Sequence, residues 1–166
     1  MDNYIVINCK KVELTEEQLK QLGISVKVKK ETPFARHSDE AYWSINAMNV
    51  VTEQRDCNDD FDNAVYENIN YFNNYDFAQQ VALQQLLYRK LLKYAYENDA
   101  IVTDWTNPAS RKYFIMKSMK MDTFDIDWNY AVKHGCDVYF TSEEVAERAI
   151  EDVVKPFMKE HPEFVW

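Results

Sequence analysis

Glycine is almost absent from this chain, which has only Gly23 and Gly135 among its 166 residues. Loops that cradle phosphate groups need several glycines, because their backbone adopts positive φ angles and approaches the ligand closely. The sequence therefore argues against nucleotide-binding folds that depend on glycine-rich phosphate loops.

Cysteine pairs and long apolar segments are also missing. The three cysteines, Cys9, Cys57 and Cys136, are far apart and form no CxxC pair, so we expect free thiols in a reducing compartment. No apolar run approaches the ~18 residues that a membrane helix needs, and no signal peptide opens the chain. These patterns predict a cytoplasmic protein that does not contact a membrane.

Residues that could form a reaction centre are scarce. The histidines His37, His134 and His161 are isolated, and no HxxxH, HxH or nucleophilic Ser or Cys motif accompanies them. We therefore expect neither enzymatic activity nor a cofactor. A small hydrolase assembled from scattered residues is an alternative that the pattern leaves open.

An apolar helical stretch over residues 74–98 organises the rest of the sequence. No glycine or proline interrupts it, and Asn74 is a suitable N-cap. A second helix is predicted over residues 143–159, where Pro156 should bend or end it. Apolar side chains recur at helical spacing in the first helix at Phe77, Val81, Leu87, Leu91 and Ala95.

The segments that lead into the two helices resemble each other. Tyr71-Phe72 precedes the first helix and Tyr139-Phe140 precedes the second. We predict two copies of a β-β-β-α unit, over residues 41–99 and 111–160. The expected strands are 42–45, 50–52 and 65–72 in the first copy, and 113–116, 124–128 and 138–140 in the second.

The N-terminal residues are predicted to form a separate β-β-α appendage, residues 1–30. Residues 31–40 have the composition of a linker, and residues 41–166 would be the main domain. The predicted fold class is α+β: an antiparallel sheet or sheets from the two repeats, with the two long helices packed on it. The appendage comprises strands at 4–7 and 12–14 and a helix opened by the capping-box pattern Thr15–Gln18.

The charge of the chain is strongly negative, at -9, and concentrates in residues 53–76. A negative surface repels the nucleic-acid backbone, so we expect no direct nucleic-acid binding. The segment is either a solvated loop or a recognition surface that offers carboxylates where a partner expects phosphates. The residues predicted to contact the partner are Asp56, Asp59, Asp60, Asp62, Glu67 and Asp76, with Trp105 as a candidate aromatic hot spot.

The same segment admits a metal-binding alternative. Asp56, Asn58, Asp60, Asp62 and Glu67 fall at positions 1, 3, 5, 7 and 12 of a calcium-binding loop. Phe61, however, stands where such a loop needs glycine, and the flanks are predicted to be strands rather than the helices of an EF-hand. A calcium-binding module therefore remains an alternative to the recognition surface.

The layout resembles that of small acidic proteins carried by phages and mobile elements of gut Firmicutes. The matching features are the opening MDNYIVINCKKVELTEEQLKQLG, the Tyr-aromatic-x-Ile strands, the Asp-rich segment, the Asp104-Trp105 loop and the two Tyr-Phe steps. Some of these proteins are anti-CRISPR or anti-restriction proteins. The resemblance implies a DNA mimic in the bacterial host cytoplasm that binds a basic surface of a host defence nuclease, such as a Cas effector. A monomer or a homodimer would suit this role, and a structural scaffold protein is the other alternative.

Overall fold

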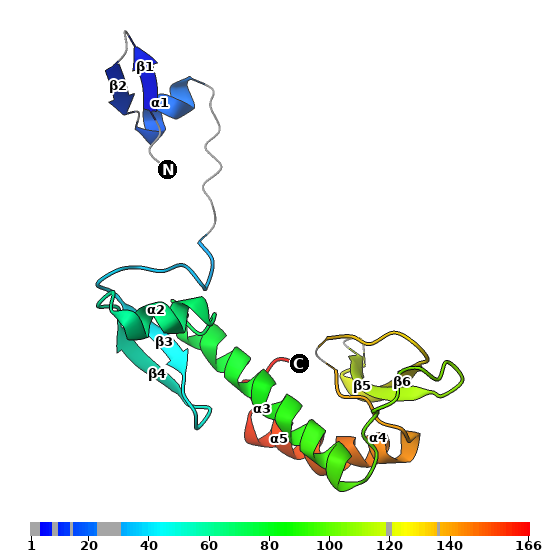
Figure 1. Cartoon of the computed structure of the whole chain (residues 1–166). Helices are drawn as coiled ribbons and strands as arrows, with labels where there is room; N and C mark the ends of the chain where they lie inside the picture. Colours follow the sequence, from blue (N-terminus) through cyan, green and yellow to red (C-terminus); the bar gives the residue numbers. More distant parts are fainter. Residues whose placement is uncertain (1–3, 8–9, 14, 23–30, 119–120, 136) are drawn as a thin grey trace. The chain divides into compact units, whose positions relative to one another are not determined.

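A computed structural model of the chain describes residues 4–7, 10–13, 15–22, 31–118, 121–135 and 137–166. The chain divides into two compact units, Met1–Thr32 and Pro33–Trp166. The described residues form an α+β fold in which helices accompany three two-stranded antiparallel sheets (Figure 1). The predicted α+β class is thus confirmed. Within these described ranges, no helix is long and apolar enough to cross a membrane.

The first unit contains an antiparallel hairpin and a short helix. Strand β1 (Tyr4–Ile7) pairs with β2 (Lys10–Glu13), and helix α1 (Glu16–Gln21) follows. The Thr15 N–H donates to Gln18 Oε1 at 2.9 Å, and the Gln18 N–H donates to Thr15 Oγ1 at 3.3 Å. This reciprocal pair satisfies two N–H groups at the start of the helix, as the capping-box pattern predicts.

The second unit opens with a hairpin and a long helix. Strand β3 (Ala41–Ile45) pairs with β4 (Val51–Arg55). Helix α3 (Tyr75–Glu97) contacts both strands, and the Asn74 side chain caps it by accepting a hydrogen bond from the Phe77 N–H at 2.8 Å. Part of the predicted linker belongs to this unit, because Pro33 O accepts a hydrogen bond from the Asn73 N–H at 2.9 Å.

The predicted strand at residues 65–72 is wrong. Helix α2 (Asp60–Glu67) takes its place, and only Phe72 forms an isolated antiparallel bridge, to Trp43 of β3. Asp59 and Asp62 form a capping box at the start of α2. These local polar contacts favour a helix over the extended conformation that the apolar alternation suggests.

The second half of this unit contains another hairpin and a second helical run. Strand β5 (Lys112–Ser118) pairs with β6 (Thr123–Asn129). The strand predicted at residues 138–140 is reduced to Phe140, which bridges Tyr113 and Ile101. The helical run then comprises α4 (Glu143–Ala149), the π-helical segment η1 (Ile150–Val154) and α5 (Lys155–Glu160).

Pro156 does not end this helical run, which continues to Glu160. A proline has no N–H, and its ring crowds the carbonyl four residues earlier, here that of Asp152. The wider turn of η1 ends two residues before the proline and includes that carbonyl. A π turn at this place is consistent with the run passing Pro156 without a break.

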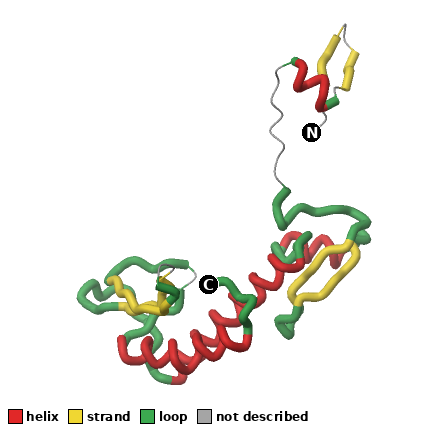
Figure 2. Tube along the Cα trace, turned by 180° about the vertical axis from the view of Figure 1, so that it is seen from behind, coloured by secondary structure: helices red, strands yellow, loops and turns green. Residues whose placement is uncertain are grey.

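The core of the second unit lies between α3 and the second helical run, which Figure 2 shows alongside α3. Leu87, Leu91 and Ala95 are buried on α3 as their spacing predicts, whereas Phe77 and Val81 are half-buried. Each fully buried Leu or Phe contributes about 1.5–3 kcal/mol. The facing residues include Phe140, Ala146, Ala149, Val154 and Phe157.

Several turns adopt the left-handed conformation without glycine. Asp and Asn tolerate positive φ better than other residues, because their short polar side chains can bond the local backbone. Ile69 is the exception to this chemistry, with a φ of 56°. The other non-glycine residues with positive φ in the described ranges are Asp39, Asn49, Asn58, Asp99 and Asp122.

Candidate functional site

The acidic segment is not one continuous loop. Strand β4 ends at Arg55, residues 56–59 form a turn, and α2 begins at Asp60. The Asp56 N–H donates to Glu40 O at 2.9 Å, and Asp56 O accepts from the Asp39 N–H at 3.0 Å. These bonds continue the hairpin pairing by one residue and fix the backbone of Asp56.

The side chain of Asp56 points inward to Arg36. Arg36 Nε donates to Asp56 Oδ2 at 2.6 Å, and Arg36 Nη2 donates to Asp56 Oδ1 at 2.8 Å. The same guanidinium also donates to Asn63 Oδ1 at 2.7 Å and to Asn58 Oδ1 at 3.2 Å. Arg36 therefore joins the residues before β3, the turn after β4 and helix α2.

Asp62 is buried as well and is held by three donors. Tyr42 Oη donates to Asp62 Oδ1 at 2.8 Å, and the Cys57 N–H donates to Asp62 Oδ2 at 2.7 Å. The Asp59 N–H makes a longer bond to Oδ2, at 3.4 Å. The buried carboxylate thus stabilises the turn by accepting hydrogen bonds from two of its backbone N–H groups.

Two tyrosines connect these acids. The rings of Tyr42 and Tyr71 stack with centroids 4.1 Å apart, and Tyr71 Oη lies 3.2 Å from Asp56 Oδ2. We call Arg36, Tyr42, Asp56, Asp62 and Tyr71 the buried network. Buried polar groups are stable only when they are hydrogen-bonded, and both carboxylates of the network meet this condition.

The network shifts the ionisation of its members. The hydrogen bond from Arg36 lowers the pKa of Asp56 to about 2. Burial alone would raise the pKa of Asp62, but the bonds from Tyr42 and from two backbone N–H groups outweigh it and hold that pKa below its ordinary value. Burial and the bond to Asp62 raise the pKa of Tyr42. Both acids therefore stay ionised inside the protein at neutral pH.

Asp56 and Asp62 do not belong to the predicted recognition surface, because both are buried. Their residues are 0% and 3% exposed, so neither carboxylate is available to a partner. Their charges are used inside the protein, where Arg36 and Tyr42 hold them. The predicted acids that are exposed are Asp59, Asp60 and Glu67, at α2, and Asp76, in the first turn of α3.

Helix α2 exposes apolar groups next to these acids. Phe61 is 59% exposed and Ile69 is 65% exposed. We call Asp59, Asp60, Phe61, Glu67 and Ile69 the α2 surface. Exposed aromatic and aliphatic side chains beside carboxylates form a surface that can bury apolar area and pair charges at once.

Ile69 holds a strained position at the end of α2. The Ile69 N–H donates to Tyr66 O and the Asn70 N–H donates to Val65 O, each at 3.0 Å, which completes a Schellman motif. The residue at this place usually is glycine, and a left-handed β-branched residue costs roughly 1–2 kcal/mol. The chain thus carries a strained and exposed apolar side chain at the edge of the α2 surface.

The five residues of the calcium-loop alternative do not converge. Asp60 and Glu67 are exposed at opposite ends of α2, about 10 Å apart along the helix axis. The Arg36 guanidinium bonds both Asp56 and Asn58 and supplies the positive charge beside them. No group of three or more potential metal ligands gathers among the residues that the structure describes.

Trp105 lies apart from the acidic segment. It is half-buried, and its ring meets Tyr139 edge-on at 4.8 Å. The buried Lys112 ammonium lies 5.6 Å from the ring centre and donates to the carbonyls of Asn107 and Ser110. These contacts are those of a loop anchor.

Sequence reasoning missed the role of Arg36, Tyr42 and Tyr71. Arg36 lies in the stretch predicted as a linker, and its partner Asp56 is twenty residues away. The one feature of the sequence that could indicate this role is a single arginine in a predicted linker, close to an acidic segment. The pattern alone does not show which acid the arginine would pair with.

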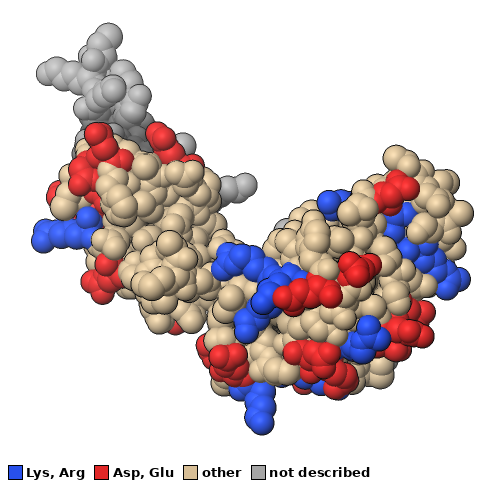
Figure 3. Space-filling view, turned by 60° about the horizontal axis from the view of Figure 1, so that its bottom comes forward, with Lys and Arg blue, Asp and Glu red and all other residues tan. Residues whose placement is uncertain are grey.

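Charge on one face of the molecule is mixed. Figure 3 shows one face, where basic and acidic side chains form small neighbouring groups rather than one uniform negative field.

The chain matches no family model, no curated protein and no solved structure.

Proposed function

We propose that the chain is a binding protein of the phage-inhibitor kind. Its α2 surface would dock on the basic, nucleic-acid-binding surface of a host defence nuclease such as a Cas effector. Arg and Lys side chains that normally bond phosphates would bond Asp59, Asp60 and Glu67 instead. The proposal assigns no reaction to the chain.

The observation that carries the proposal is the composition of the α2 surface. It combines three exposed carboxylates with the exposed ring of Phe61, and Ile69 is exposed despite the free-energy cost of its backbone conformation. Strained residues persist where the surrounding structure holds them, and they are often found at binding sites. Acids provide steering and selectivity, and a large apolar side chain provides affinity when it is buried by a partner.

The buried network would contribute by holding this surface rigid. Arg36 bonds Asn63 on α2 and Asp56 in the turn before it. The Asp59 carboxylate accepts a hydrogen bond from the Asp62 N–H at 2.9 Å, which fixes the start of the helix. A surface that is ordered before binding loses less conformational entropy when the complex forms.

We also propose that the two halves of the second unit are copies of one unit. The support is a shared arrangement: Phe72 bridges Trp43 and Phe140 bridges Tyr113, so each Tyr-Phe step pairs with the first strand of a hairpin. A helix follows each step. The segments between hairpin and step differ, because residues 56–70 contain α2 whereas the described residues 130–135 and 137–138 lie in no helix. The α2 surface would then be what distinguishes the first copy.

Binding to purified defence nucleases, including Cas effectors, tests the function. We expect binding at low salt that weakens as salt rises and that competes with the nuclease's own nucleic acid. The double variant Asp60→Asn/Glu67→Gln should weaken binding roughly three- to tenfold, and Phe61→Ala by at least about tenfold. These residues lie outside the buried network, so the fold is retained.

The matched control is Asp125→Asn, which removes an exposed carboxylate from β6. It should leave the affinity unchanged. The proposal fails if none of the nucleases binds at low salt. It also fails if the double variant binds as tightly as the unaltered protein.

A further inference from the structure

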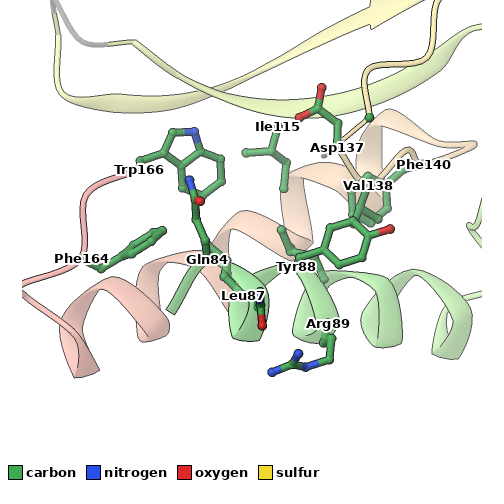
Figure 4. Close-up of a pocket in the computed structure, with 13 residues that line it drawn as sticks. Gln84, Leu87, Tyr88, Arg89, Ile115, Asp137, Val138, Phe140, Phe164 and Trp166 are labelled. Atoms are coloured by element: carbon green, nitrogen blue, oxygen red, sulfur yellow. The ribbon is translucent and has the colours of Figure 1, made fainter. Parts of the chain in front are cut away.

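A cavity of about 690 Å³ lies in the second unit, away from α2. Helix α3 forms one side of it, and β5 with the segment before α4 forms the other (Figure 4). Phe164 and Trp166 close one end. Cavities that hold small organic ligands have volumes of roughly 300–1,000 Å³.

Most of the lining is apolar. The contributing aliphatic residues include Leu87, Leu91, Ile115 and Val138, all of which are buried. Aromatic rings add to it: Tyr88 extends from α3 beside Val138, and Trp166 lies at the opposite end of the cavity (Figure 4). Such a lining accepts a hydrocarbon or aromatic body and excludes a strongly hydrated one.

The aromatic end of the cavity is held in place. Gln80 Nε2 donates to Glu163 O at 2.7 Å, and the Val165 N–H donates to Gln80 Oε1 at 2.9 Å. Phe164 packs edge-on against Phe157, with centroids 5.4 Å apart, and Trp166 packs against Phe124 at 5.0 Å. The wall formed by the C-terminal residues is therefore preformed for a ligand.

Two oppositely charged residues, Arg89 and Asp137, lie at the rim of the cavity. Arg89 donates to Asn49 Oδ1, and Figure 4 shows its side chain directed away from the cavity. Asp137 lies on the side opposite α3, near Ile115 (Figure 4), and its Oδ2 is 3.0 Å from His134 Nδ1. That contact engages Oδ2, so a ligand would bond through Oδ1.

We propose that this cavity binds a small organic cation, a primary ammonium group carried on an aromatic or aliphatic body. The ammonium group would bond Asp137, and the body would lie among the apolar residues. A carboxylate at the edge of an apolar cavity favours a cation over a neutral or anionic ligand of equal size. The net charge of -9 favours cations at longer range.

Three ligands of nearly equal size test the charge preference: 2-phenylethylammonium, 2-phenylethanol and phenylacetate. Each is titrated into ¹⁵N-labelled full-length protein and followed by the backbone amide shifts. We expect saturable shifts for the ammonium ion at residues 84–91, 137–140 and 164–166. Its dissociation constant should be about tenfold or more below that of the alcohol, and phenylacetate should bind most weakly.

Asp137→Asn identifies the carboxylate that recognises the cation. It should weaken binding of the ammonium ion about tenfold, to the level of the alcohol, and leave the alcohol unaffected. Asp125→Asn, with the same loss of charge on β6, should change neither value. Equal affinity for the three ligands would overturn the proposal, as would shifts at other residues or no saturation by about 10 mM. The ligand comparison needs no variant, so it stands even if Asp137→Asn folds poorly.

Discussion

Arg36 holds the buried carboxylate of Asp56 at two points, with Nε–Oδ2 at 2.6 Å and Nη2–Oδ1 at 2.8 Å. Planar, two-point contacts of this kind are the strongest form of arginine–carboxylate bonding. Because Asp56 is 0% exposed, solvent does not stabilise its charge. The stability of the turn before α2 therefore depends on the protein's own donors.

Replacing Asp56 with asparagine should strongly destabilise the fold. The amide cannot accept both guanidinium hydrogen bonds, and Arg36 would lose its balancing charge. We expect the free energy of unfolding to fall by about 3 kcal/mol, measured by urea denaturation. Asp60→Asn is the control, because Asp60 is exposed, and it should stay within about 0.5 kcal/mol of the unaltered protein. A small effect of Asp56→Asn would show that the pair is not needed for stability.

Replacing Tyr42 with phenylalanine should also destabilise the fold. The change removes the Oη donor to the buried Asp62 carboxylate and keeps the stacked ring. Hydrogen bonds to charged groups contribute about 1.5–3 kcal/mol, so we expect a loss of about 2 kcal/mol in urea denaturation. Tyr66→Phe, at an exposed ring, should have little effect. Equal losses from both variants would mean that the bond to Asp62 contributes nothing specific.

Acidic pH should lower the free energy of unfolding, because Asp56 binds a proton more readily in the unfolded chain. The pKa of Asp56 is about 2 in the folded state, against an ordinary value of 3.8. As the pH falls through 3.8, the unfolded chain binds a proton that the folded protein still excludes, so the stabilisation is full above about pH 5 and lost toward pH 2. The pKa of Asp62 is shifted in the same direction.

Urea denaturation at a series of pH values measures this loss. In Asp56→Asn the free energy of unfolding should fall less steeply between about pH 5 and pH 2, because one of the responsible carboxyls is gone. An unchanged slope would contradict the low pKa of Asp56.

Replacing Ile69 with glycine should stabilise the protein. Glycine adopts the left-handed conformation without the steric cost that Ile69 bears at a φ of 56°. We expect the free energy of unfolding to rise by roughly 1 kcal/mol. Ala64→Gly, at an exposed position inside α2, should instead lower it by about 1 kcal/mol. If both glycines destabilise, the backbone at Ile69 is not strained.

The same variant separates strain from binding. If Ile69 belongs to the α2 surface as proposed, Ile69→Gly should be more stable and bind the partner less tightly. A variant that gains both stability and affinity would remove Ile69 from the surface.

Features that depend on neighbouring residues could be predicted from the sequence. The helix after Asn74, its buried positions Leu87 and Leu91, and the Thr15–Gln18 capping box all follow from contacts within a few residues. Each is specified by side-chain spacing and by donors that the local backbone exposes.

Features that depend on distant partners could not be predicted. The acids of residues 56–62 look equivalent in sequence, yet Asp56 and Asp62 are buried and Asp60 is exposed. What separates them is the approach of Arg36 and Tyr42, twenty residues earlier in the chain.

The use of Asp and Asn at left-handed turns also affects the chain before it folds. Glycine at these positions would let the unfolded chain sample many more conformations, all of which must be given up on folding. Asp39, Asn49, Asn58, Asp99 and Asp122 restrict that freedom while still reaching positive φ. Relative to glycine, each such residue lowers the conformational-entropy cost of folding by up to about 0.4–1 kcal/mol. The free-energy cost of the left-handed backbone reduces this gain. Scarcity of glycine can thus help a chain with a modest core to keep its native state.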